Sequence, residues 1–125
     1  MKKTIQTNNA PQAVGPYSQA IDCGDIVFLS GQIPIVPETG CLVEGDITAQ
    51  THQIFQNIKA VLEAAGLSMD HVVKTTVYMT NLADFGTLNE IYATYFSEPF
   101  PARSCVGVSS LPKGAQVECE VIAKR

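Results

Sequence analysis

The strongest constraint on the fold is a helical pattern that lies between two stretches of strand-like sequence. Between Ile47 and Ala65, apolar side chains recur at steps of three and four residues, which is the spacing of one face of an α-helix. Asp46 is a good N-cap residue, and Gly66 stands where a left-handed residue ends many helices. The pattern predicts an amphipathic helix with the inner residues Ile47, Thr51, Ile54, Phe55, Ile58, Val61, Leu62 and Ala65.

Strands are predicted on both sides of this helix, and a second helix follows. The segment His71–Met79 is rich in β-branched residues, which strands favour. Asn81 then introduces a second helix that Pro99 ends. Its inner stripe consists of Phe85, Leu88, Ile91, Tyr92, Tyr95 and Phe96. The predicted order is βββαβαββ in one domain, residues 1–125, with the other strands at Thr4–Gln6, Gln19–Asp22, Ile26–Ile33, Ala102–Ser109 and Ala115–Ala123.

The predicted order limits how the elements pack. Crossovers between parallel strands are almost always right-handed, so two of them in one sheet tend to put both helices on the same face. The opposite face is then uncovered. It should be partly apolar, because neither set of alternate residues in His71–Met79 is polar throughout. A chain of 125 residues has nothing left to cover this face, so the sequence predicts a homo-oligomer.

Arg103 stands in the stretch FPARSCVGV, which otherwise reads as the entry to a core strand. We expect the last two strands to form a hairpin. With an even loop and no bulge, the alternation of side chains places Arg103 on the same face as Glu118 and Glu120, the face that an oligomer would cover. Two interpretations stay open. One is an exposed ion pair of little energetic value, and the other is a sheltered guanidinium that binds a small carboxylate through two parallel hydrogen bonds.

The composition argues against several classes of protein. The net charge is −4, and the eight Lys and Arg residues do not form the dense basic stripe that a nucleic-acid binder needs. No apolar run is long enough to span a bilayer, and the N-terminus has no apolar core of a signal peptide. The four cysteines form no C-x-x-C pair, and only two histidines are present. We expect reduced thiols packed as small hydrophobes, no metal site and a cytoplasmic location.

Six blocks of sequence occur in a recognisable order along essentially the whole chain: GPYSQA, FLSGQIP, VVKTTVYMTNLADF, FPARSCVGV, LPKGA and VECEVIA. Together they resemble the RidA/YjgF family of reactive-intermediate imine deaminases. The resemblance implies a chorismate-mutase-like α+β fold with one sheet and two helices on one face. It also implies a homotrimer whose sheets form a central barrel, with ligand clefts between neighbouring subunits.

The reaction that the resemblance implies is the hydrolysis of 2-imino acids, such as 2-iminobutanoate and 2-iminopropanoate, or of their enamine tautomers, to 2-oxo acids and ammonia. At the matching positions, Arg103 would hold the substrate carboxylate and Glu118 would activate water. No metal or organic cofactor is needed. The implied partners are small 2-imino and 2-oxo acids and further copies of the chain, with no nucleic acid and no membrane. Further substrate-binding positions that match are Tyr17, Ser30, Gly31, Asn89 and Cys105.

Several of these positions also have an ordinary structural interpretation. Tyr17 could cap the end of the barrel, and Ser30-Gly31 could form a β-bulge. Cys105 could simply fill space, because the sequence shows no adjacent base that would lower its pKa. Glu120 does not match the base of the family and is interpreted as an outer charge.

A second function of a different class is kept open: a non-catalytic protein that binds small carboxylates such as 2-oxo acids, or a regulatory protein, on the same trimeric scaffold. A protein that only binds carboxylates needs Arg103 but has no use for a base that activates water. The presence of Glu118 together with Arg103 therefore favours the enzyme.

Overall fold

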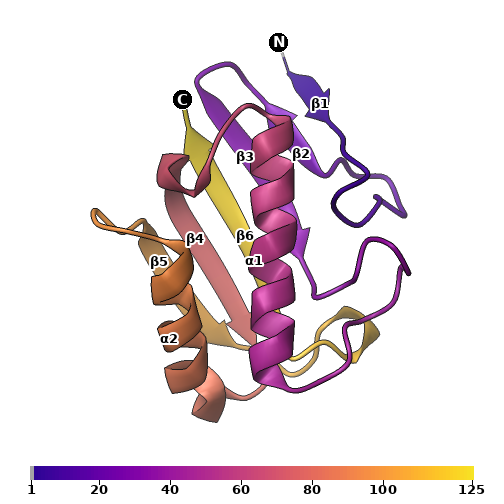
Figure 1. Cartoon of the computed structure of the whole chain (residues 1–125), viewed down its shortest axis with the longest axis vertical. Coiled ribbons are helices and arrows are strands. Elements are labelled where there is room, and N and C mark those ends of the chain that lie inside the picture. The colour runs from indigo at the N-terminus through magenta and orange to yellow at the C-terminus, as the bar shows by residue number, and fades with distance from the viewer. Residues whose placement is uncertain (1) are drawn as a thin grey trace.

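The structure is a computed structural model that describes residues 2–125, and its elements follow the order βββαβαββ (Figure 1). Short 3₁₀ turns lie at Met69–His71, Leu82–Asp84 and Pro112–Gly114. The strands are β1 Lys3–Ile5, β2 Ala20–Asp22, β3 Ile26–Gln32, β4 Val72–Met79, β5 Ala102–Gly107 and β6 Val117–Lys124, and the helices are α1 Ile47–Ala64 and α2 Phe85–Tyr95.

The strands form one mixed sheet with the order β1-β2-β3-β6-β4-β5. β6 runs antiparallel to both of its neighbours, β3 and β4, whereas β4 and β5 are parallel. The predicted hairpin between the last two strands is therefore wrong, because β4 lies between them. The chain between β5 and β6 passes round the end of β4, where the N–H of Val108 donates to the carbonyl of Met79 and the N–H of Thr80 donates to that of Gln116.

The crossover helix α2 explains this difference. Parallel neighbours need a long connection, and α2 supplies one between β4 and β5. Strands that follow one another along a chain often pair, but β3 and β4 already occupy both edges of β6. The hairpin prediction used only the short connection between β5 and β6, which does not show that another strand lies between them.

The register assigns each side chain to one face of the sheet. Arg103 pairs with Thr75 of β4, and Thr75 pairs with Val121 of β6. Thr75 and Val121 are buried beneath the helices, so Arg103 belongs to the helix-covered face. Glu118 and Glu120 belong to the alternate set of β6. The prediction that Arg103 shares a face with these two glutamates is therefore wrong.

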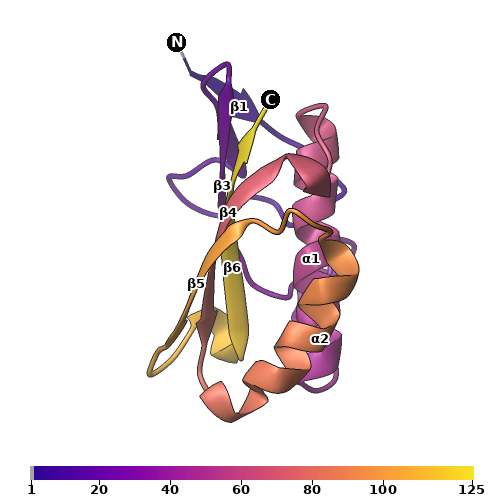
Figure 2. The same ribbon diagram turned by 90° about the vertical axis from the view of Figure 1, so that its left-hand side faces the viewer.

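Both helices cover the same face of the sheet, as the edge-on view in Figure 2 shows. The predicted ends of α1 are confirmed: the Asp46 carboxylate accepts hydrogen bonds from two backbone N–H groups, and Gly66 has a φ of +76°. Phe55 of α1 packs against the rings of Tyr92 and Phe96 at centroid distances of 5.7 Å. Within residues 2–125, neither helix has the length and apolar character that crossing a membrane requires.

The other face of the sheet has no helix packed against it among the described residues (Figure 2). Phe28 of β3 is 46% exposed there, and Val106 of β5 is 42% exposed. Ile26 is also exposed. The prediction of an uncovered, partly apolar face is therefore confirmed for the single chain.

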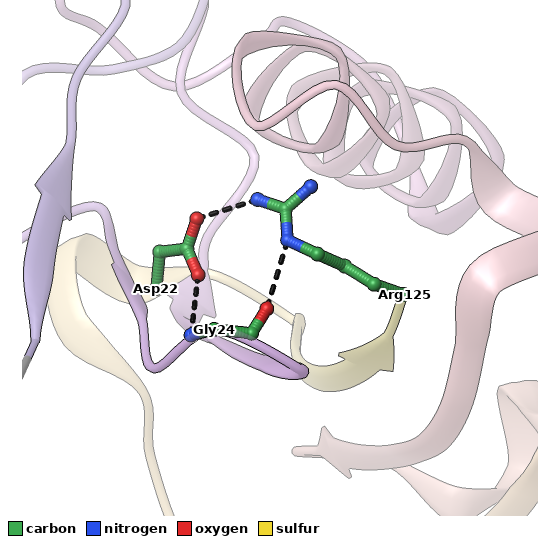
Figure 3. A network of polar contacts seen from close by, with 3 residues as sticks. All are labelled: Asp22, Gly24 and Arg125. Carbon is green, nitrogen blue, oxygen red and sulfur yellow. Dashed lines mark hydrogen bonds and ion pairs between the residues drawn. The ribbon is translucent and has the colours of Figure 1, made fainter.

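A polar cluster joins the end of β6 to the turn between β2 and β3 (Figure 3). Nη2 of Arg125 lies 2.5 Å from Oδ2 of Asp22, and its Nε donates to the Gly24 carbonyl at 2.9 Å. The N–H of Gly24 and the Arg125 guanidinium both hydrogen-bond to Asp22 and hold the pKa of its carboxyl below the usual range. Because the cluster is exposed, it orients the turn and contributes little to stability.

Candidate functional site

Arg103 lies against α2. Its Nη1 donates a hydrogen bond to Oδ1 of Asn89 at 2.7 Å. Its Cζ lies 4.7 Å from the centroid of the Tyr92 ring and 5.2 Å from that of Phe85. Aromatic faces attract a cation at these distances, so the two rings and the amide restrict the half-buried guanidinium to one orientation.

A cleft of about 560 Å³ opens beside Arg103, between α2 and the start of β5. Among residues 2–125, no carboxylate lies within ion-pair distance of the guanidinium, although Glu90 also lines the cleft. A guanidinium has five N–H donors in a planar fork that matches the two oxygens of a carboxylate. We refer to this cleft as the arginine half-site; its lining includes Asn89, Tyr92, Phe100, Pro101 and Arg103.

Glu118 lies on the opposite face of the sheet, next to an irregularity in β3. The register between β3 and β6 shifts between Leu29 and Gln32, which confirms the bulge interpretation of Ser30-Gly31. A Cβ added to Gly31 would overlap Oε2 of Glu118 and lie 3.0 Å from its Cδ. The close approach of the carboxylate therefore requires glycine at this position.

A second cavity, of about 460 Å³, lies beside Glu118. We refer to Tyr17, Gly31, Lys113 and Glu118, which line part of it, as the glutamate half-site. Lys113 has a φ of +59°, a left-handed conformation that is uncommon outside glycine. The 3₁₀ turn Pro112–Gly114 therefore brings an ammonium side chain to the same cavity as the carboxylate. Much of the remaining lining is apolar and includes Val14, Ile33, Ile35 and Pro112.

The environment of Glu118 raises the pKa of its carboxyl above the usual glutamate range. Burial is the main cause, because it disfavours the charged form, and the negative charge of Glu120 adds to it. A raised pKa makes the ionised carboxylate a stronger base than a free glutamate. Glu118 can therefore take a proton from a water molecule more readily.

Tyr17 and Ser30, both predicted to bind substrate, have different surroundings. Tyr17 is 51% exposed and lines the Glu118 cavity, where its hydroxyl accepts the N–H of Val14 at 3.4 Å. The Ser30 hydroxyl donates to the carbonyl of Ser18 at 2.6 Å, and Ser30 is outside the lining of that cavity. The structure therefore brings Tyr17 to Glu118, while the Ser30 side chain supports the bulge.

Cys105 faces the helices, because its partner in β4 is the buried Val77. Burial raises the pKa of its thiol, and the charge of Arg103 opposes this rise. Cys105 lines neither half-site, so its surroundings fit the packing interpretation better than contact with substrate. Cys23 and Cys41 are exposed, so the prediction that all four cysteines pack as small hydrophobes is wrong for these two.

Within one chain, the sheet separates the two half-sites. Arg103 and Asn89 lie on the helix-covered side at the β5 edge, and Glu118 lies on the uncovered side of β6, two strands away. A substrate small enough to be an imino acid is not held by both within a single chain. The geometry therefore offers a carboxylate-binding half and a base-bearing half that are separate surfaces of the same protomer.

Two features of the half-sites were not predicted from the sequence. Phe85 and Tyr92 were assigned to the inner stripe of the second helix, but their contact with Arg103 was missed. The parallel pairing of β4 and β5 creates that contact. The hairpin prediction placed Arg103 on the face away from the helices, so it did not include this contact. Lys113 was also missed, although a lysine directly before Gly114 in a tight turn was a usable signal.

Both histidines take part in local structure. Nδ1 of His52 lies 2.9 Å from the Tyr95 hydroxyl, and Nδ1 of His71 accepts the N–H of Ser68 at 3.1 Å in a capping box. Within residues 2–125, no group of three His, Cys, Asp or Glu side chains is arranged to hold a metal ion.

The family described as Endoribonuclease L-PSP matches residues 7–125. The chain belongs to this family, and its resemblance to RidA/YjgF proteins is confirmed by relatives and structures of that group.

Three relatives show how close the similarity is. A protein of Salmonella typhimurium named 2-iminobutanoate/2-iminopropanoate deaminase is 52% identical, and the alignment covers 100% of this chain and 99% of the relative. YyfA of Yersinia pestis, a protein of the conserved Rid family, is 56% identical with a TM-score of 0.97 over 100% of both chains. TdcF of Escherichia coli, solved with bound serine, is 47% identical with a TM-score of 0.93 over 98% of both chains.

Proposed function

We propose that the protein hydrolyses small 2-imino acids, such as 2-iminobutanoate and 2-iminopropanoate, or their enamine tautomers, to 2-oxo acids and ammonia. The observation that carries the proposal is the pair of half-sites: an oriented guanidinium beside an open cleft, and a carboxylate with a raised pKa beside a second cavity. Relatives that align over the whole chain at 51–52% identity are named for this activity. The TdcF structure contains serine, which is a small molecule with a carboxylate of the kind that Arg103 would bind.

The complete site in this proposal lies between neighbouring protomers of a homotrimer whose sheets form a central barrel. The separation of the half-sites by the sheet supports it, because a site with both parts needs a second chain. The exposed apolar side chains Phe28 and Val106 also support it, since assembly would remove them from water. In a ring of identical chains, the arginine half-site of one protomer can meet the glutamate half-site of the next at every interface.

Arg103 binds the carboxylate of the substrate. Asn89 and the Tyr92 ring orient the planar fork before the substrate arrives, so little side-chain freedom is lost on binding. Two parallel hydrogen bonds to the carboxylate fix the direction in which the imine carbon points. Fixing that direction replaces a random encounter with water by an aligned one.

Glu118 takes a proton from a water molecule while the water oxygen bonds to the imine carbon. The π electrons of the C=N bond move to nitrogen, Glu118 passes the proton on to that nitrogen, and the product is a tetrahedral 2-amino-2-hydroxy acid. Glu118 then takes the proton of the new hydroxyl and gives it to nitrogen as the C–N bond breaks, so that ammonia and the 2-oxo acid leave. Each proton that Glu118 accepts goes on to nitrogen, so the enzyme ends unchanged.

A coupled assay tests the proposal against the non-catalytic alternative. A serine/threonine dehydratase generates the imine, and semicarbazide competes with hydrolysis for it. We expect the protein to accelerate formation of the free 2-oxo acid. If pure protein binds 2-oxo acids in calorimetry but gives no acceleration, the carboxylate-binding function replaces the proposed one.

RNA cleavage, which the descriptive name of the family suggests, is not part of the proposal. The net charge is −4, and the two histidines lie on separate elements with their own local partners.

A cytoplasmic location is part of the proposal, and the exposed free thiols of Cys23 and Cys41 support it, because a reducing compartment keeps such thiols unpaired.

A further inference from the structure

Glu120 has a role in the structure that its sequence position did not suggest. It is half-buried, and its Oε1 accepts a hydrogen bond from the Tyr78 hydroxyl at 2.5 Å. Tyr78 is the register partner of Glu118 across the β4–β6 pair. Tyr78 therefore lies opposite Glu118, and its side chain runs diagonally across the uncovered face of the sheet to the carboxylate of Glu120.

We propose that Tyr78 and Glu120 form a positioning pair that makes Glu118, and not Glu120, the carboxylate that accepts the proton from water. The inference rests on the proposed imine hydrolysis and adds two residues to it. Neither residue needs to touch the substrate, because both act through Glu118.

The direction of the effect follows from electrostatics. The hydroxyl of Tyr78 donates to the Glu120 carboxylate and holds it in place beside Glu118 on the same face of β6. The hydrogen bond to Glu120 is also the main cause of the raised pKa of Tyr78, so this hydroxyl remains a donor at neutral pH. An ionised Glu120 in turn adds to the raised pKa of Glu118. Glu118 lines the cavity and has a raised pKa, whereas Glu120 does not line it and is engaged by Tyr78, so Glu118 is the carboxylate available to a water molecule there.

Other charged or titratable groups also lie near Glu118. They are unchanged in the variants of Tyr78 and Glu120 proposed below, so they cannot cause a shift of the pH profile between wild type and variant. β3 contributes no titratable side chain to this face. In the proposed trimer, Arg103 of the partner subunit also approaches Glu118. The remaining groups are Tyr17 and Lys113 at the Glu118 cavity, Lys74 on β4 and Lys124 farther along β6.

Two near-isosteric substitutions test the pair through the pH profile of kcat/KM for imine hydrolysis. In Glu120→Gln the acid limb should move to lower pH by about half to one unit, because a unit negative charge beside Glu118 is lost. In Tyr78→Phe the limb should move in the same direction by less, because the charge of Glu120 remains but is no longer held beside Glu118 by the Tyr78 hydroxyl. Glu63→Gln, which removes an exposed charge on α1, is the matched control and should leave the limb in place.

A second measurement does not depend on turnover. A ¹³C NMR titration of the glutamate carboxyl groups, with Glu118 assigned through Glu118→Gln, should place the Glu118 pKa above the usual range in the wild type and lower in Glu120→Gln. An unchanged acid limb in Glu120→Gln with turnover intact overturns the inference, and so does a Glu118 titration that is the same in both proteins. A wild-type protein without hydrolysis refutes the proposed function instead, and the Glu118 titration then still decides the role of the pair.

Discussion

The arginine half-site and the glutamate half-site differ in how the surroundings act on the charged side chain. At Arg103 the surroundings fix the direction of the guanidinium: an amide oxygen lies 2.7 Å from Nη1, and an aromatic ring centroid lies 4.7 Å from Cζ. At Glu118 the surroundings disfavour the charge, through burial and through the nearby Glu120. In the proposed function, the first half-site holds the substrate anion, and the second provides a carboxylate that accepts a proton.

This contrast shows why a single sheet keeps the two groups apart. If the arginine and the glutamate shared one face, as the hairpin prediction required, they could neutralise each other as an ordinary ion pair. Within residues 2–125 of the single chain, their separation leaves the guanidinium without a carboxylate partner and leaves the Glu118 pKa raised. In the proposed trimer, activity depends on assembly, because a second chain brings the other half-site.

The largest effect is expected at Arg103. Arg103→Ala should lower kcat/KM by about 10³- to 10⁵-fold and weaken 2-oxo acid binding, because both the grip and the orientation of the substrate are lost. Arg103→Lys should recover little of this, since an ammonium cannot form the planar fork or stack on Tyr92. Arg125→Ala is the matched control and should keep full activity. Steady-state kinetics and calorimetry with pyruvate measure both effects, and near wild-type turnover in Arg103→Ala would refute the assignment.

Glu118→Gln should separate chemistry from binding. We expect kcat to fall by about 10²- to 10³-fold, as for the loss of a general base, while the Kd for pyruvate changes little. In the wild type, activity should be present above the Glu118 pKa and lost as the pH falls through it, at a pH above the usual glutamate range. Substantial weakening of pyruvate binding in Glu118→Gln would show that the two half-sites do not have separate tasks.

Gly31→Ala tests how closely Glu118 must approach β3. The added methyl would overlap the carboxylate, so either the Glu118 side chain or the bulge must shift. A displacement of this size should cost about ten- to a hundredfold in kcat. Gly86→Ala, which adds a methyl group in open space at the start of α2, is the control and should leave kcat unchanged. Wild-type kcat in Gly31→Ala would mean that the position of Glu118 is not critical.

The smallest effect is expected at Asn89, which supports Arg103. Asn89→Ala removes one hydrogen bond to a charged group, so kcat/KM should fall by about tenfold. Asn89→Asp should cost more, because the new carboxylate would pair with the guanidinium and compete with substrate. Equal kinetics for the two variants would show that Asn89 does not orient Arg103.

The sequence was sufficient for the local structure of α1 and for naming the residues to which the proposal assigns the chemistry. The helical period from Ile47, the N-cap at Asp46 and the glycine at 66 depend on neighbours along the chain, and all three were predicted correctly. The family motifs also contain Arg103 and Glu118, the two residues on which the proposed function depends. These predictions needed no knowledge of which strands pair.

The arrangement of the half-sites could not be predicted in the same way. Which face Arg103 occupies depends on the insertion of β6 between β3 and β4, and this is a long-range property of the sheet. The contact of Tyr92 with Arg103 and the bond of Tyr78 to Glu120 depend on the same pairing. An alternation pattern tells which residues of one strand share a face, but it does not relate that face to the face of another strand.

A mixing experiment tests the shared site most directly. Arg103→Ala and Glu118→Gln, each inactive alone, are unfolded together at equal concentrations and refolded, and the mixture is assayed for imine hydrolysis. If every site takes its arginine from one chain and its glutamate from the next, random mixing should restore about one quarter of the wild-type activity. If both groups act within one chain, the refolded mixture should remain as inactive as either variant alone, and that result would contradict a site shared between neighbouring chains.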